Sequence, residues 1–153
     1  MRDVAPPPPT AAPAKPPDPA LEAARAAFDA MPEADRKAIQ DALVWTGDQF
    51  GTVDGSFGRQ TYEGLMAHQR RMKLPPDGIL DGKGRAALVA EGQRLRLAVG
   101  FSVMDDEKTG ARIGIPTKVL PKRDVNPNGG SRWQSGDGKI TVDTRSVPAG
   151  DRV

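Results

Sequence analysis

The chain has 153 residues, a net charge of +2 and no cysteine. The lack of cysteine excludes disulfide bonds, thiol catalysis and thiolate metal sites, and the small net charge gives no argument for a nucleic-acid partner. Aromatic residues make up only 5% of the chain, so we expect one compact core of modest size and looser material elsewhere.

The first 19 residues are rich in proline and alanine, with four consecutive prolines at 6–9. Such a segment has almost nothing to bury, so residues 1–19 are predicted to form a disordered tether. No signal peptide is visible, and no apolar run approaches the ~20 residues that a membrane span needs. A tether of this composition often follows an export signal or membrane anchor, which favours a truncated or trimmed chain over a cytoplasmic protein. The sequence leaves open whether Met1 is the native start.

Two helices are predicted after the tether. Residues 20–31 are interpreted as a lead-in helix, because alanine favours helix and Asp18 is a suitable N-cap, although the apolar stripe is thin. The next helix is predicted from Pro32 to Trp45. Its apolar residues recur with the helical period, and Gly47 lies just past its end.

A short pattern then occurs twice, at 53–61 and at 76–84. Each copy is an Asp-Gly turn, a large apolar residue two positions after the glycine, and the start of a helix. We expect both apolar side chains to be buried under their loops, and glycine to supply the positive φ that the turns need. A turn-and-helix unit used twice indicates a small helical module with little room for a catalytic cleft. The structural members of the pattern are Gly55, Phe57, Gly58, Thr61, Gly78 and Leu80.

Two more helices are predicted, over about 59–72 and 82–97. After Gly100 the sequence pattern predicts β-strands. Two hairpins are expected, one around the turn at 105–110 and one across 136–138, with a loop at 123–131. So few strands bury too little apolar surface to form a stable core of their own. Residues 98–153 are therefore interpreted either as the start of a larger, truncated domain or as strands docked on the helices.

The segment from about 33 to 92 resembles a known family, the peptidoglycan-binding-like domain, a three-helix module of bacterial cell-wall proteins. The resemblance is carried by Ile39-Gln40-Asp41-Ala42-Leu43, by Val53-Asp54-Gly55-Ser56-Phe57-Gly58-Arg59-Gln60-Thr61, and by Leu74-Pro75-Pro76-Asp77-Gly78-Ile79 followed by Leu88. His68 and Gly84 depart from the pattern, since the family usually has an aromatic residue and a threonine there. The resemblance implies a small three-helix bundle over 32–97. Together with the Pro-rich disordered N-terminus and the short C-terminal β segment, complete or truncated, this predicts a mainly α fold.

The resemblance also implies binding to the glycan strands or stem peptides of the wall. Aromatic rings can stack on sugars, and arginine can form charge-assisted hydrogen bonds with stem-peptide carboxylates. Trp45 and Trp133 are further rings suited to stacking. The more frequent roles are structural: aspartate before glycine closes a turn, and arginines line a solvated helix face. The candidate ligand-binding residues are Arg59, Tyr62, Arg70, Arg71, Asp54 and Asp77.

These observations favour a non-catalytic module that binds peptidoglycan and tethers an attached domain or protein to the wall. No catalytic residue, cofactor or metal is predicted, because His68 is the only histidine and no Gly-x-Ser-x-Gly motif occurs. The alternatives are a structural or protein-interaction scaffold without glycan affinity, and a fragment of a cell-wall hydrolase. A wall-binding role implies a periplasmic or secreted protein, whose oligomeric state the sequence leaves open.

Overall fold

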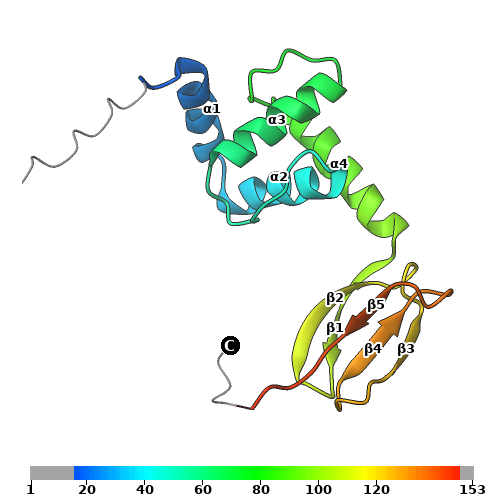
Figure 1. Cartoon of the computed structure of the whole chain (residues 1–153). Coiled ribbons are helices and arrows are strands. Elements are labelled where there is room, and N and C mark those ends of the chain that lie inside the picture. Colours follow the sequence, from blue (N-terminus) through cyan, green and yellow to red (C-terminus); the bar gives the residue numbers. More distant parts are fainter. Residues whose placement is uncertain (1–15, 149–153) are drawn as a thin grey trace, which may run out of the picture.

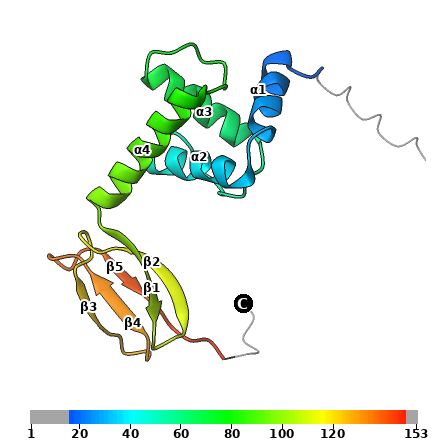
Figure 2. The ribbon, with the colours of Figure 1, turned by 180° about the vertical axis from the view of Figure 1, so that it is seen from behind.

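The computed structural model describes residues 16–148, so most of the predicted tether lies outside the described range (Figure 1). The helices gather at one end and the strands at the other, and the two bodies join where the last helix leads into the first strand (Figures 1 and 2). The elements are α1 (Pro19–Asp29), α2 (Glu33–Thr46), α3 (Arg59–Arg71), α4 (Gly82–Ala98), β1 (Phe101–Asp106), β2 (Ala111–Pro116), β3 (Lys122–Val125), β4 (Ser131–Gln134) and β5 (Thr141–Asp143).

The prediction of a three-helix bundle with a short β segment is wrong. Four helices share one core, and five strands in two sheets follow them. The thin apolar stripe of α1 is sufficient for packing because Ala24 and Phe28 are both buried. Phe28 finds an aromatic partner in Phe57 of the first Asp-Gly loop, with ring centroids 5.4 Å apart.

Local signals fix three of the helix ends. The Asp18 side chain accepts a hydrogen bond from the Ala20 amide at 3.0 Å, and the C-cap of α2 is Gly47 with a φ of +79°. The Asp81 side chain caps α4 by accepting from the amide of Gly84 at 2.6 Å. By contrast, Gly58 at the start of α3 offers no capping side chain. The first turn of α3 therefore keeps backbone donors that no side chain satisfies.

Helices α2 and α4 approach each other closely where they cross. A Cβ atom placed on Gly92 would lie 2.7 Å from the Cα of Ala42, so the two helices approach over glycine and alanine. This contact holds α4 against α2. The buried apolar residues of the core are Ala24, Phe28, Ile39, Ala42, Leu43, Phe57, Leu65 and Leu88.

The strands form two antiparallel sheets, β1-β2 and β3-β4-β5. Both predicted hairpins are present, but the expected loop at 123–131 overlaps strand β3, which pairs with β4. Ile115, Leu120 and Trp133 make a second core within this body. The strands therefore bury their apolar residues against one another. Trp133 is only 2% exposed, so its ring is not available for stacking on a sugar.

Few contacts join the two bodies. The ring of Phe101 at the start of β1 lies edge-on to Trp45 of α2, with centroids 5.3 Å apart, and the guanidinium of Arg96 lies 4.7 Å from the Phe101 centroid. The Lys118 ammonium donates to the Leu97 carbonyl at 3.5 Å. Over residues 16–148, no helix has the length and apolar character needed to cross a membrane.

Candidate functional site

The two Asp-Gly turns close in the same way. The Asp54 carboxylate accepts from the amide of Ser56 at 2.8 Å, and the Asp77 carboxylate accepts from the amide of Ile79 at 2.9 Å. The intervening glycines have φ values of +78° and +76°. These backbone hydrogen bonds lower the pKa of both carboxyl groups below the ordinary value. Both aspartates are thus engaged in their own turns.

A buried glutamine from α2 fixes the first turn. Gln40 is 1% exposed, and its side-chain oxygen accepts from the amide of Gly55 at 2.7 Å. Its Nε2 donates to the carbonyl of Ser56 at 2.9 Å and to the hydroxyl of Thr61 at 3.1 Å. One amide side chain therefore satisfies donors and acceptors on both sides of the turn.

A second glutamine, from α3, repeats this arrangement at the second turn. The Gln69 oxygen accepts from the amide of Gly78 at 2.8 Å, while its Nε2 donates to the Ile79 carbonyl at 2.9 Å and the Asp77 carboxylate at 2.7 Å. Neither Gln40 nor Gln69 was among the predicted site residues, although Gln40 lies in the motif that carries the family resemblance. The available signal was a polar residue on the apolar face of the helix before each turn.

Phe57 lies in the helical core at 6% exposure, between the rings of Phe28 and Tyr62. Its carbonyl accepts from Nη1 of Arg25 at 3.1 Å, which links the first loop to α1. Leu80, the equivalent residue of the second loop, is half-buried and packs on the same core.

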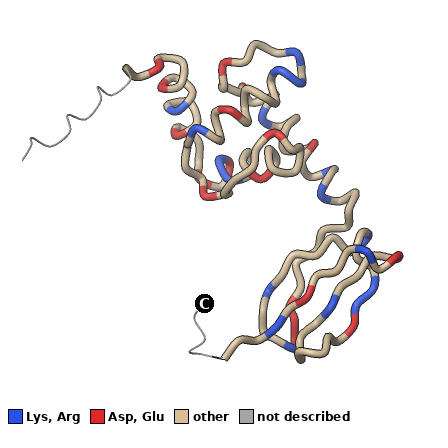
Figure 3. The backbone as a smooth tube through the Cα atoms, in the orientation of Figure 1, with Lys and Arg blue, Asp and Glu red and all other residues tan. Residues whose placement is uncertain are grey.

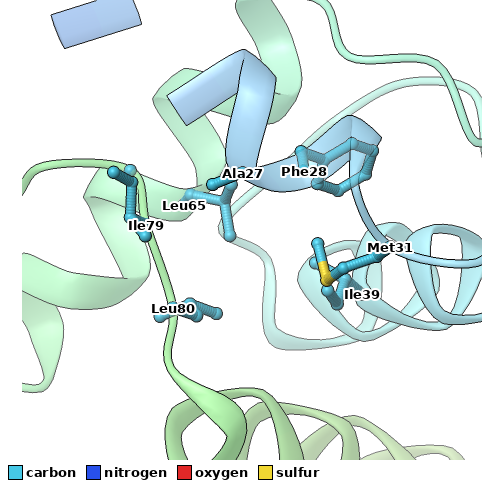
Figure 4. A pocket seen from close by; sticks show the side chains of 8 residues that line it. Ala27, Phe28, Met31, Ile39, Leu65, Ile79 and Leu80 are labelled. Carbon is cyan, nitrogen blue, oxygen red and sulfur yellow. The ribbon is translucent and has the colours of Figure 1, made fainter. Parts of the chain in front are cut away.

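The space under the second loop is a packing void. Leu80 borders it together with side chains of α1, α2 and α3 (Figure 4). Its volume is only about 20 Å³, close to the room that one water molecule needs. This void is too small for a sugar or a peptide.

Arg59 and Tyr62 lie one helical turn apart on α3 and line a groove of about 650 Å³ between α3 and the start of α1. Tyr62 is half-buried, and a Cβ atom on Gly78 would lie 2.6 Å from its ring. Its ring thus packs against the second turn and also borders the groove. Arg59 is exposed and forms an ion pair with Glu63 at 3.0 Å. The other groove residues are Pro16, Pro17, Asp18, Leu21, Glu22 and Met66.

Arg70 and Arg71 lie at the opposite end of α3, about 17–18 Å from Arg59 along the helix axis. The Arg71 guanidinium donates to Asp48 and Glu91, each at 2.8 Å. These hydrogen bonds, first those with Asp48, raise the pKa of Arg71 above its ordinary value. The structure therefore does not gather the six predicted ligand-binding residues into one cluster.

His68 belongs to the same network as Arg71. It is 3% exposed, with its Nδ1 3.1 Å from Nη2 of Arg71 and 3.7 Å from a carboxylate oxygen of Asp48. Burial, and then the charge of Arg71, lower the pKa of His68 below the ordinary value. A buried imidazole with a lowered pKa thus occupies this position of α3. Across residues 16–148, no group of three or more His, Asp or Glu side chains could hold a metal ion.

Both the helical body and the β body carry basic and acidic residues (Figure 3). A second hollow, of about 280 Å³, lies at the first Asp-Gly turn and includes Asp54 and Arg59. It is also lined by Gln49, a buried residue that was not among the predicted site residues because its loop shows no helical or strand periodicity.

Residues 32–88 match the family described as "Putative peptidoglycan binding domain". The match runs from the start of α2 into α4 and includes both Asp-Gly turns, so the resemblance seen in the sequence is confirmed over this range. The curated proteins and the solved structures yielded no match to the chain.

Proposed function

We propose that the helical body is a non-catalytic module that binds peptidoglycan and holds an attached domain or protein at the cell wall. The match of residues 32–88 to a peptidoglycan-binding family carries this proposal. The paired turns, each fixed by a buried glutamine, lie within the matched segment and give it a rigid surface. Such a role requires contact with the wall, so we propose a periplasmic or secreted location.

The groove bordered by Arg59 and Tyr62 is the part of the predicted site best suited to a wall ligand. Asp54 and Asp77 are engaged in turn closure, and Arg71 is engaged with two carboxylates. Tyr62 combines an apolar ring with a polar hydroxyl, which suits a sugar ring. Arg59 adds a cation at the rim, where a stem-peptide carboxylate could displace Glu63.

A pull-down with purified insoluble peptidoglycan tests this proposal. We expect the wild-type chain to sediment with the wall at low salt. Tyr62→Ala should bind about tenfold more weakly, the effect of about 1.4 kcal/mol. Arg59→Ala should bind more weakly mainly at low salt, because its exposed charge is screened as salt rises.

Arg112→Ala, on the exposed surface of β2, is a charge-matched control that should bind as the wild type does. Thermal melts of each variant separate lost binding from lost folding. A wild-type chain that stays in the supernatant at low salt would contradict wall binding. Equal binding by Tyr62→Ala would remove the groove from the proposal.

The second candidate function is a scaffold that positions the β body and has no affinity for glycan. It is favoured by the contacts of Phe101, which lies against Trp45 and Arg96 of the helical body. This arrangement would couple the two bodies mechanically. The third interpretation, a fragment of a hydrolase, gains no support from the matched segment, because the family description names binding.

A further inference from the structure

A groove between α2 and α4 opens beside the crossing of these two helices. They approach closely at Ala42 and Gly92, and from there they diverge toward their N-terminal ends (Figures 1 and 2). The groove has a volume of about 280 Å³. This is slightly below the ~300–1,000 Å³ usual for small-molecule sites, so the groove suits one end of a ligand. Its lining residues are Asp35, Ala38 and Ile39 of α2, and Arg85, Ala86 and Val89 of α4.

The lining of this α2–α4 groove changes from charged to apolar toward the crossing. Asp35 and Arg85 each lie two helical turns, about 10 Å, before the crossing on their own helix. Ile39 and Val89 follow them one turn later on the same helix faces. Ile39 is buried and Val89 is half-buried. A ligand end in the groove thus has charged groups at one end and an apolar wall at the other.

The two charged side chains of the groove are unpaired. Asp35 and Arg85 carry opposite charges, yet neither side chain has an ion-pair or hydrogen-bond partner among residues 16–148. The basic residues that follow Asp35 on α2 are engaged elsewhere, since Lys37 pairs with Glu33 at 2.6 Å and Arg36 donates to the first Asp-Gly turn at 2.9 Å. Within the part of the chain that the structure describes, no other charged residue lines the groove.

This lining favours a ligand that carries both signs of charge. A guanidinium binds a carboxylate through two parallel hydrogen bonds, and a carboxylate accepts strong hydrogen bonds from an ammonium group. A ligand with only one sign of charge would meet one side chain of its own sign. The apolar residues of the groove can cover a short hydrocarbon chain, because burying it removes apolar surface from water.

We propose that the α2–α4 groove binds a carbon that carries both an ammonium and a carboxylate group, with the carboxylate on Arg85 and the ammonium on Asp35. In peptidoglycan, this chemistry occurs at the free side-chain end of diaminopimelate in an uncrosslinked stem peptide. The methylene groups of that side chain would lie against Ile39 and Val89. The assignment to the wall rests on the proposed function, whereas the charge selectivity of the groove does not.

Binding of soluble probes to the full chain tests this subsite. The probes are an Ala-γ-Glu-diaminopimelate tripeptide, the matching Ala-γ-Glu-Lys tripeptide, which lacks the carboxylate at the side-chain end, and free D-alanine. We expect the diaminopimelate tripeptide to shift the methyl NMR signals of Ile39 and Val89. The lysine tripeptide should bind at least about fivefold more weakly, because it offers nothing to Arg85 at that position.

Free D-alanine distinguishes the two sources of an ammonium and a carboxylate on one carbon. Shifts with the diaminopimelate tripeptide assign the stem peptide. Shifts with D-alanine and none with that tripeptide would assign the groove to free amino acids and overturn its assignment to the wall. Equal binding of the two tripeptides, or silence of both methyl signals with every probe, overturns the subsite.

Charge-removing variants provide an independent readout. Arg85→Gln and Asp35→Asn should each weaken binding of the diaminopimelate tripeptide at least about fivefold. Their melting temperatures should match that of the wild type, because neither side chain has an ion-pair partner to lose. Lys83→Gln on α4 and Asp41→Asn on α2 are the matched controls, since they remove the same charges outside the groove lining and should bind as the wild type does.

The outcomes separate this subsite from the proposed function. If the wild-type chain sediments with insoluble peptidoglycan but Arg85→Gln and Asp35→Asn bind the tripeptide as their controls do, the subsite is overturned and wall binding stands. Lower melting temperatures of both variants with unchanged tripeptide binding would show an ion pair across the groove in place of a subsite. A wild-type chain that stays in the supernatant but responds to D-alanine overturns the proposed function and leaves the charge selectivity of the groove intact.

Discussion

Single buried polar side chains organise the loops in both bodies. In the helical body, Gln40 and Gln69 each satisfy the backbone groups of one Asp-Gly turn. In the β body, Asp106 at the end of β1 is fully buried and accepts from the hydroxyls of Thr109 and Thr144, each at 2.6 Å, and from that of Ser131. Each of these residues fixes segments that are distant in the sequence, so their effects on stability should exceed those of surface residues.

The pH dependence of stability should report on Asp106. Hydrogen bonds from hydroxyls, first that of Ser131, hold the pKa of this carboxyl well below its usual range. A lowered pKa in the folded state stabilises the fold fully above the ordinary carboxyl pKa of about 3.9, and this contribution is lost as pH falls below that value. We expect the melting temperature of the β body to fall on acidification, measured by Trp133 fluorescence in the Trp45→Phe variant.

Asp106→Asn in that background isolates this contribution from other carboxyl groups. The variant should melt at a lower temperature than its parent at neutral pH, because an amide cannot accept all the hydroxyl donors. Its melting temperature should then depend less on pH between about pH 5 and pH 3. Parallel pH profiles of the two proteins would show that Asp106 does not titrate differently in the folded state.

At the scale of secondary-structure elements, the crossing of α2 and α4 depends on Gly92. Gly92→Ala would place a methyl group 2.7 Å from the Cα of Ala42, where backbone must move to admit it. We expect a loss of about 1–3 kcal/mol in the free energy of unfolding from this overpacking, reduced by the better helix propensity of alanine. Urea denaturation followed by circular dichroism measures the change.

Gly82→Ala is the matched control on the same helix, because the nearest atom to its new methyl group is the end of the flexible Arg85 side chain at 3.7 Å. Its stability should be unchanged within about 0.5 kcal/mol. If Gly92→Ala is as stable as this control, the two helices can separate without cost and the close crossing is not required.

At the scale of the whole molecule, two cores meet through a small contact around Phe101. Each body contains one tryptophan, Trp45 in the helices and Trp133 in the strands. We expect the bodies to unfold at different midpoints, because little apolar surface joins them. In the Trp45→Phe variant, far-UV circular dichroism follows the helices and fluorescence follows the β core. Coincident transitions would instead favour the scaffold function.

Local sequence patterns predicted much of this fold. Asp18, Gly47 and Asp81 identified helix ends, because capping depends on residues within one turn of each other. The hairpin around 105–110 was predicted for the same reason. The Asp-Gly pattern and the family resemblance, placed at about 33–92 from the sequence and matched over 32–88, were also recognisable, since both depend on spacing along the chain.

The candidate site was less predictable. The helical pattern of the sequence places Arg71 on the surface of its helix. Only the folded structure brings its guanidinium into contact with Asp48 and Glu91. Gln49 lies in a loop whose local sequence carries no sign of burial. Gln49 can be buried here because Gly64 has no side chain. A Cβ atom at Gly64 would lie 3.0 Å from the Cβ atom of Gln49. Contacts of this kind join residues that are far apart in sequence, so no short pattern encodes them.

The sequence by itself determined the helix ends, the hairpins, the paired turns and the likeness to a wall-binding family. Tertiary structure alone decided that α1 joins the helical core through Phe28 and Phe57, and that the strands build a core around Trp133. The physical reason is that turns and caps are satisfied by near neighbours, whereas burial depends on which distant surfaces meet.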